Sequence, residues 1–308
     1  MTLQSPFDVS DEIQVALGLG AAVVALESAV VTHGLPYPAN LEAARRMERT
    51  IREHGAVPAA VALIGGRVRV GLAEEDLGYL AARGVVKVGR RDLAVAIARQ
   101  ASGGTTVSAT LAVAHALGVR VQATGGIGGV HVGAAPTWDI SADLDELSRR
   151  PLVLVCSGAK AICDVGATLE ALETRGVTVI GYRTVRFPYF YVADSGHPVP
   201  WSADSVAEIA AISRAKERLG DMSALLVANP PPEQWALPAD DVAEAVARAV
   251  TRAETEGIRG GDLTPYLLSE VDRLTRGRAV QANLALLEAN AALAAQIAVA
   301  LTEERLPA

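Results

Sequence analysis

The sequence is poor in cysteine and in aromatic residues. Only two of its 308 residues are cysteines, Cys156 and Cys163, and their spacing matches neither a disulfide framework nor a metal site. We therefore expect two buried thiols in a reducing compartment. Phe, Trp and Tyr make up only 4% of the chain, so the stacking surfaces that hold single-stranded nucleic acid are scarce.

Basic residues are outnumbered by acidic ones, 28 to 35. The formal net charge is -7 at pH 7, and no block of lysine or arginine could follow a phosphate backbone. A polymeric nucleic-acid partner is therefore not expected. A small anionic substrate remains compatible with this balance, because a single binding site needs only local positive charge.

No segment of the sequence is typical of export or of a membrane span. The first residues, MTLQSPFDVSDEIQ, lack a basic region followed by an apolar one, so no signal peptide is expected. The longest late apolar stretch, 284–301, is interrupted by Glu288, Asn290 and Gln296, which favours a core helix over a membrane helix. We therefore expect a cytoplasmic protein with no membrane partner.

Short β-type runs alternate with helical segments that end in glycine, as expected of helices packed on a largely parallel sheet. After Asn229 three helical segments follow without a further strand. The prediction is a single α/β domain over 1–308, with a peripheral segment 1–20, a helical C-terminal layer, and a candidate lid or oligomer contact at 183–201. The strand candidates are 21–28, 57–66, 85–89, 119–126, 152–158, 177–182 and 224–230, and the helix candidates are 40–54, 74–83, 105–117, 159–175, 239–256, 265–276 and 280–302.

Lysine is rare among the basic residues. Of 28 lysines and arginines only three are lysines, namely Lys87, Lys160 and Lys216. Because guanidinium does not act as a nucleophile, lysine should remain mainly where a compact amine is needed. Lys216 lies in a charged helical stretch and is expected to be solvated. Lys87 and Lys160 adjoin apolar strands, where desolvation lowers an ammonium pKa towards the free amine of Schiff-base catalysis. Each is a candidate for catalysis or phosphate binding, or else a core lysine paired to a carboxylate.

Glu27 ends an otherwise apolar strand, VVALE, where a carboxylate is costly unless it is paired or functional. In open α/β sheets, ligands collect at the carboxyl ends of the strands. Glu27, Lys87, the TGGIGG loop and Lys160 all fall near predicted strand ends, so one sheet edge is expected to gather them. A structural salt bridge between Glu27 and Lys87 is the alternative.

The stretch 123–147 is the densest functional candidate. Its glycines allow the backbone to approach a ligand closely, and Ser141 can cap a helix whose first amides would hold a phosphate. Asp139 and Asp143 flank that cap, either as ordinary partners of the helix dipole or as holders of a hydrated divalent cation. The glycines give G-x-G-x-x-H up to His131, which does not complete the dinucleotide fingerprint, and His131 becomes a candidate substrate contact.

Ordered motifs along most of the chain resemble one known family. ALES, THGLPYPAN, VPAAVALIGG, KVGRRDL, TTVSAT, ATGGIGGVHVGA, DISADL, CSGAK and VANPPPEQ occur in this order, from about residue 25 to 283. Together they are similar to the pseudouridine-5'-phosphate glycosidase family, also described as indigoidine synthase A-like. The resemblance implies a three-layer α/β/α fold with a largely parallel or mixed sheet, a homotrimer, a divalent metal that is usually manganese, and reversible conversion of pseudouridine 5'-phosphate and water to ribose 5-phosphate and uracil.

The resemblance also assigns roles to individual residues. It makes Lys160 of CSGAK the covalent nucleophile, Glu27 of ALES the proton donor and Asp139 of DISADL the metal ligand. It implies that the following residues contact the substrate: Lys87, Thr106, Val107, Thr124, His131, Ser141, Ala142, Asp143 and Asn283.

The chemistry explains why an amine and a carboxylate would be needed. A C-glycoside has no oxygen or nitrogen leaving group, so the paired-carboxylate route of ordinary glycosidases would expel a poor carbanion. An iminium between Lys160 and C1' of the opened ribose avoids this, while Glu27 handles the proton at uracil C5. Two alternatives are a Schiff-base aldolase acting on another sugar phosphate, which would not release uracil, and a non-catalytic sugar-phosphate sensor, which would show no turnover.

Overall fold

A computed structural model describes residues 5–82, 84–258 and 263–303. The chain divides into two compact units, one formed by Met1–Ala123 together with Ala291–Ala308 and the other by Thr124–Asn290. The prediction of one domain over 1–308 stays a prediction. Residues 1–4 of the expected peripheral segment, and Arg83 at the end of one helix candidate, lie outside the described residues.

The first unit contains a mixed sheet. Its strand order is β1 (Phe7–Val9), β4 (Arg67–Val70), β3 (Val57–Ile64), β2 (Val23–Glu27) and β7 (Val121–Ala123). β2 runs parallel to β3 and to β7, whereas β3 and β4 are antiparallel. Two short strands extend from β3, since β6 (Gly103–Thr105) pairs with β3 and also with β5 (Val86–Val88).

Helices cover this sheet because their apolar faces need burial. In α2 the spacing of Ala43, Met47 and Ile51 places one buried stripe along the helix. Every residue of β2 is buried, as expected of a strand covered on both faces. The helices and helical turns of the unit are α1 (Asp11–Gly18), η1 (Val30–Gly34), α2 (Ala39–Glu53), α3 (Glu74–Ala82), η2 (Arg90–Asp92), α4 (Leu93–Ala98) and α5 (Val107–Ala116).

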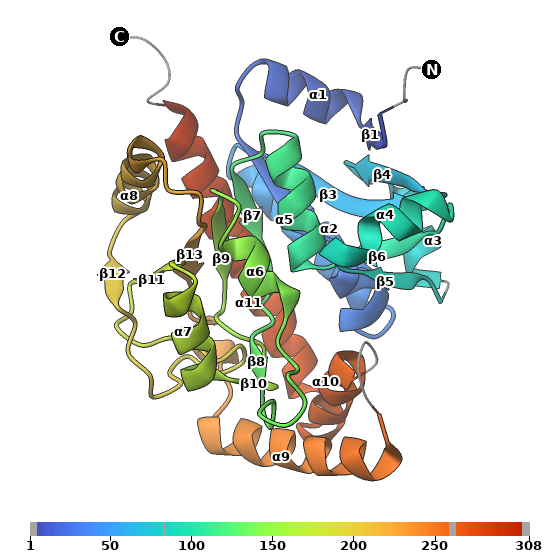
Figure 1. Cartoon of the computed structure of the whole chain (residues 1–308), viewed down its shortest axis with the longest axis vertical. Coiled ribbons are helices and arrows are strands. Elements are labelled where there is room, and N and C mark those ends of the chain that lie inside the picture. The colour runs from blue at the N-terminus through green and yellow to red at the C-terminus, as the bar shows by residue number, and fades with distance from the viewer. Residues whose placement is uncertain (1–4, 83, 259–262, 304–308) are drawn as a thin grey trace. The chain divides into compact units, whose positions relative to one another are not determined.

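The second unit contains a parallel sheet of order β9 (Val153–Cys156), β13 (Leu225–Ala228), β11 (Thr178–Tyr182) and β12 (Trp201–Ala203). A separate antiparallel pair joins β8 (Val130–His131) to β10 (Cys163–Asp164). Helices α9 and α10 follow the last strand and pack side by side (Figure 1). The helices and helical turns are α6 (Ala142–Leu147), α7 (Val165–Thr174), α8 (Val206–Leu219), η3 (Glu233–Trp235), α9 (Ala239–Glu256), α10 (Leu263–Leu274) and α11 (Arg278–Glu303), the last of which continues into the first unit.

Helix α11 is long and apolar. Among the described residues, only its segment Arg278–Thr302 has the length and composition to cross a membrane, with a mean hydropathy of 1.8. However, 61% of that window is buried inside the protein. This burial agrees with the core helix expected from the sequence, since a helix that is apolar all round is suited to the inside of a protein core.

The α/β class is confirmed, and each strand candidate corresponds to an observed strand. The short strands β1, β4, β6, β8, β10 and β12 were not predicted. Unlike the equally short β5, β7, β9 and β13, they do not lie in an apolar run of the sequence, and two to four residues alone carry too little periodicity. One helix prediction was wrong at its start. The candidate 159–175 begins as a helix only at Val165, so Lys160 lies in a loop and Cys163 in β10 rather than in a helix.

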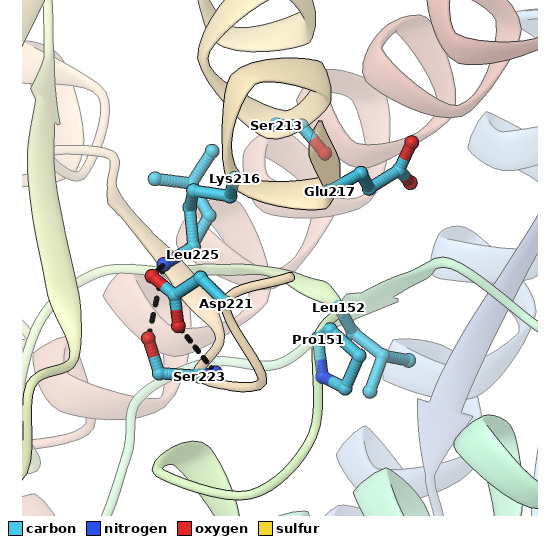
Figure 2. Close-up of a pocket in the computed structure, with 8 residues that line it drawn as sticks. All are labelled: Pro151, Leu152, Ser213, Lys216, Glu217, Asp221, Ser223 and Leu225. Atoms are coloured by element: carbon cyan, nitrogen blue, oxygen red, sulfur yellow. Dashed lines mark hydrogen bonds and ion pairs between the residues drawn. The ribbon is translucent and has the colours of Figure 1, made fainter. Parts of the chain in front are cut away.

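The expectation that Lys216 is solvated was wrong. Lys216 is 9% exposed, and its Nζ donates to Thr178 Oγ1 at 3.0 Å and to Ser223 Oγ at 2.9 Å. It also forms an ion pair with Asp221. Figure 2 shows Lys216, Asp221 and Ser223 in a small pocket that Pro151 and Leu152 also line. An ammonium has three N–H donors, so these three oxygens satisfy it, and Lys216 acts as a structural crosslink.

Replacing Lys216 should destabilise the protein in a pH-dependent way. Burial alone would raise the pKa of Asp221, but hydrogen bonds from Lys216 and Ser223 outweigh it and the pKa is lowered. A lowered carboxyl pKa contributes stability above its unfolded value and loses it as the pH falls through the folded value. We expect Lys216→Met to lower the free energy of unfolding by about 2 kcal/mol at pH 7. The loss should be smaller in acid, where Asp221 becomes protonated. Urea titrations at pH 7 and in acid measure both effects.

The matched control is Arg218→Met on the same helix, since Arg218 is exposed. It should change the free energy of unfolding by less than about 0.5 kcal/mol at either pH. Equal effects of the two substitutions would contradict the role of Lys216 as a crosslink.

Candidate functional site

Glu27 occupies the carboxyl end of β2 and is 9% exposed. The next residue, Ser28, fixes the chain there, because its Oγ donates to the Val61 carbonyl at 2.6 Å and accepts from the Thr105 amide at 3.0 Å. The Thr105 hydroxyl donates to the same Val61 carbonyl at 2.6 Å. The ends of β2 and β6 and the middle of β3 are therefore tied together directly beside Glu27.

Lys87 and Thr106 belong to the same corner of the first unit. Lys87 lies in β5 opposite Gly104 of β6, and the Thr106 amide donates to the Val88 carbonyl at 2.9 Å. A Cβ on Gly104 would meet Thr32 Oγ1 at 2.2 Å and the Ser28 carbonyl oxygen at 2.9 Å. Glycine thus lets β6, and Lys87 with it, approach the segment that follows Glu27.

Thr106 is the N-cap of α5 and Val107 is its first residue. Val107 is fully buried. The Thr106 and Ser108 hydroxyls lie 3.0 Å apart. This corner brings a helix N-terminus and two hydroxyls beside the strand that carries Lys87, and these are groups of the kind that bind phosphate.

In the second unit, Lys160 is held against the glycine-rich loop by backbone hydrogen bonds. The Lys160 amide donates to the Ile127 carbonyl at 2.9 Å, and the Ile127 amide donates to the Gly158 carbonyl at 3.0 Å. The Ser157 amide donates to the Gly125 carbonyl at 2.8 Å. The two loops therefore run side by side, and the sequence prediction that the TGGIGG loop lies near Lys160 is confirmed within this unit.

Both cysteine thiols lie in the second unit and are buried. Burial raises the pKa of Cys163 to about 12, the Gly129 backbone and Lys160 act in the opposite direction, and Asp143 and Asp139 raise it further. Burial also raises the pKa of Cys156 to about 12. The expectation that the two thiols are buried is confirmed, and both stay protonated at neutral pH.

Ser141 caps α6 as predicted, since its Oγ accepts from the Asp143 amide at 3.2 Å. The buried Asp143 carboxylate accepts the Gly128 amide at 2.8 Å. A Cβ on Gly128 would lie 2.3 Å from Ser141 Oγ. Glycine is therefore required where the loop meets the cap, and Ala142, which begins α6, lies at the same point.

Asp139 and His131 face each other beside this cap. His131 Nδ1 lies 3.4 Å from Asp139 Oδ1 and 3.1 Å from the Asp139 carbonyl oxygen. The Asp139 side chain is 39% exposed and so remains open to solvent. Within the described ranges, no three His, Cys, Asp or Glu side chains are grouped to hold a metal ion. One open carboxylate still fits a hydrated cation of the magnesium type, which keeps most of its waters.

Thr124 and Asn283 are both buried, Thr124 before the glycine-rich loop and Asn283 on α11.

A further residue of this site, Asn290, was not predicted from the sequence, where it stood out only as a polar interruption of an apolar helix. The fully buried Asn290 donates through Nδ2 to the Thr124 carbonyl at 2.9 Å and to Ser157 Oγ at 3.1 Å. It therefore fastens the start of the glycine-rich loop and the start of the Lys160 loop to one helix.

Comparison with known proteins identifies the family. A sequence model described as "Indigoidine synthase A like protein" matches residues 12–300. The chain belongs to this family. A relative from Methylobacterium nodulans named pseudouridine-5'-phosphate glycosidase is 54% identical, over 97% of this chain and 89% of its own length. A relative of the same name from Caldanaerobacter subterraneus is 46% identical, over 96% of this chain and 97% of its own length.

Two solved structures of indigoidine synthase A-like architecture share the fold. The prealnumycin C-glycosynthase in complex with ribulose 5-phosphate matches with a TM-score of 0.90 and 35% identity, covering 98% of this chain and 99% of that one. An indigoidine synthase A-like protein from Thermotoga maritima matches with a TM-score of 0.89 and 37% identity at the same coverage. The α/β fold expected from the sequence is therefore confirmed by both.

Proposed function

We propose that this protein cleaves the carbon–carbon glycosidic bond of pseudouridine 5'-phosphate, consuming water and releasing ribose 5-phosphate and uracil in a reversible reaction. The observation that carries the proposal is 54% identity over 97% of the chain to a relative named for this activity. The complex of a family member with ribulose 5-phosphate supports a sugar phosphate as the ligand class.

The reaction begins with Lys160 as the nucleophile. Its amine bonds to C1' as the bond from C1' to the ring oxygen breaks, and the ring oxygen takes up the proton that the nitrogen loses, which opens the ribose. Glu27 then protonates uracil C5 while the bond between C1' and C5 breaks, so the electron pair of that bond stays with uracil and no free carbanion forms. The nitrogen lone pair forms the imine with C1', and water hydrolyses that imine to release ribose 5-phosphate and the free lysine.

The single phosphate group of the substrate is proposed to bind positively charged and helix-capping groups. Lys87 with the α5 N-terminus at Thr106 and Val107, and the segment from Ser141 to Asp143, supply the ammonium, amide and hydroxyl donors that anions bind. Thr124, His131 and Asn283 are further proposed substrate contacts. Binding energy from the phosphate positions the reacting carbon, which is how remote contacts raise a rate.

We also propose that the protein uses a divalent cation, manganese in particular. Asp139 would hold it through one carboxylate, with His131 alongside, and the cation would supply positive charge near the substrate anion. A homotrimer and a cytoplasmic location are also proposed. Sedimentation velocity of the purified protein tests the trimer.

A second candidate function is the synthesis of a C-glycoside on an acceptor other than uracil. The likeness to a prealnumycin C-glycosynthase at 35% identity favours it. Incubating the protein with ribose 5-phosphate and either uracil or an aromatic acceptor separates the two functions. If ribose 5-phosphate condenses with uracil and not with the aromatic acceptor, the result supports the glycosidase. The aldolase alternative fails if the protein releases uracil from pseudouridine 5'-phosphate.

The covalent role of Lys160 can be trapped chemically. With pseudouridine 5'-phosphate and manganese the protein should release uracil, and borohydride in the presence of ribose 5-phosphate should add one sugar phosphate at Lys160. Lys160→Ala should stay folded, lose turnover and take up no label in intact-mass measurements. Lys216→Arg, which retains a cation at the structural crosslink, should be labelled like the wild type. A turning-over enzyme whose mass never changes would rule out the imine.

Glu27 should matter to bond cleavage more than to binding. Because general acids and bases typically contribute about a hundredfold to ten-thousandfold, Glu27→Gln should slow uracil release by a factor in that range. Its affinity for ribose 5-phosphate should be retained, as measured by calorimetry. Glu53→Gln, at an exposed carboxylate of α2, is the control and should not slow turnover. If Glu27 only neutralises Lys87, Glu27→Gln would instead keep turnover but lower the melting temperature or the affinity.

Asp139 should set the metal requirement. Chelation should abolish turnover reversibly, and Asp139→Asn should raise the manganese concentration for half-maximal activity by at least about tenfold, because the oxygen remains and only the charge is lost. Asp145→Asn is the control, since Asp145 is more than half exposed and pairs with Arg175 on the surface. Full activity of Asp139→Ala after exhaustive chelation would contradict the assignment.

A further inference from the structure

The loop that carries Lys160 is held on a second side by an aromatic segment, 187–192. This segment belongs to the stretch 183–201, a candidate lid or oligomer contact on sequence grounds. Its central residues Phe187, Phe190 and Tyr191 are at most 3% exposed, so they form part of the core of the second unit rather than a mobile cover.

Contacts between this segment and the Lys160 loop are made through backbone and side chain. The Phe190 amide donates to the Ser157 carbonyl at 2.9 Å, and Tyr189 forms a β-bridge with Gly158. The Tyr189 hydroxyl donates a hydrogen bond to the carbonyl of Ala161, the residue directly after Lys160. The Lys160 amide is meanwhile bonded to Ile127 of the glycine-rich loop. The peptide groups around Lys160 are therefore fixed from both sides.

The backbone of the aromatic segment is strained, which indicates that its position is imposed. Phe190 has φ +54°, a left-handed conformation that is costly for a bulky residue. Its ring lies where a Cβ on Gly126 would approach within 2.7 Å. The conformation keeps the ring on the glycine-rich loop and leaves the neighbouring Tyr189 hydroxyl on Ala161.

We propose that Tyr189 is a positioning residue for Lys160: its hydrogen bond to the Ala161 carbonyl fixes the backbone from which the reacting amine projects. The inference rests on the proposed function, because it assumes that Lys160 is the nucleophile. The backbone on both sides of the Lys160 Cα is held by the hydrogen bonds of the Lys160 amide and the Ala161 carbonyl, which together set the direction in which the Lys160 side chain leaves the loop. A displacement of about 1 Å at a reacting group can cost a hundredfold in rate.

The Tyr189 hydroxyl remains a donor over the working pH range. Burial raises its pKa, and the nearby Cys163 and Asp164 raise it further. The phenol therefore stays protonated, and the Ala161 carbonyl keeps its partner. Ala161 is fully buried, so loss of the hydroxyl would leave its carbonyl without that partner in the core and free the loop to shift.

Tyr189→Phe is the decisive variant, because it removes one oxygen and keeps the ring. We expect kcat for uracil release to fall about tenfold while KM for pseudouridine 5'-phosphate changes less than about twofold, since the substrate contacts are untouched. The rate of borohydride trapping at saturating ribose 5-phosphate should fall by the same factor as kcat. Tyr182→Phe is the matched control. Tyr182 ends β11 and packs against the Arg183 guanidinium, and removal of its hydroxyl should leave both rates unchanged.

The outcomes separate the positioning role from a structural one and from failure of the proposed function. A lowered melting temperature with unchanged kcat, measured well below melting, overturns the inference and leaves Tyr189 purely structural. A rise in KM with unchanged kcat also overturns it. If the wild type releases uracil but is never trapped at Lys160, the imine proposal fails and the inference falls with it. Parallel losses in kcat and trapping, with KM and folding retained, support it.

Discussion

The hydrogen bond from the Lys160 amide to the Ile127 carbonyl is the contact on which the second unit's candidate site depends. It joins the loop after β9 to the glycine-rich loop after Thr124, two segments that are far apart in sequence. Bonds from Ser157 to Gly125 and from Ile127 to Gly158 extend the pairing, so the loops behave as one element. A flexible lysine side chain gains a defined direction only if its backbone is held in this way.

Glycine makes this arrangement possible for steric reasons. A Cβ on Gly129 would lie 2.2 Å from Thr168 Oγ1, and one on Gly158 would lie 1.9 Å from the Pro188 carbonyl oxygen. Gly158 also has φ +74°, which favours glycine over any residue with a side chain. The glycines of TGGIGG therefore admit neighbouring side chains and backbone, and this packing role exists beside any role in approaching a ligand.

Buried polar residues fix both the scaffold and the chemistry. Asn290 fastens the two loops to α11, Asp143 holds the Gly128 amide, and Lys216 crosslinks α8 to the strands beside it. Each of these groups is costly to bury unless it is hydrogen-bonded, so each specifies one arrangement of the elements around it. Relatives named as a glycosidase and as a C-glycosynthase share this family, which is consistent with one scaffold that handles C-glycosidic bonds of different acceptors.

The sequence by itself determined the α/β class, the strands that lie in apolar runs, the Ser141 cap and the choice of Lys160 and Glu27 as candidates. These features depend on local hydrophobic pattern, capping chemistry and the cost of an isolated charge. The sequence did not determine the short strands outside such runs, since β8 and β10 exist only because the loops pair with each other. The burial of Lys216 was also beyond it, because the partners Thr178 and Ser223 reach it only through the sheet. Only the tertiary structure showed that the Tyr189 hydroxyl donates to the carbonyl of Ala161, the residue after Lys160. Tyr189 and Ala161 are 28 positions apart, and a contact over that distance depends on packing and leaves no local pattern in the sequence.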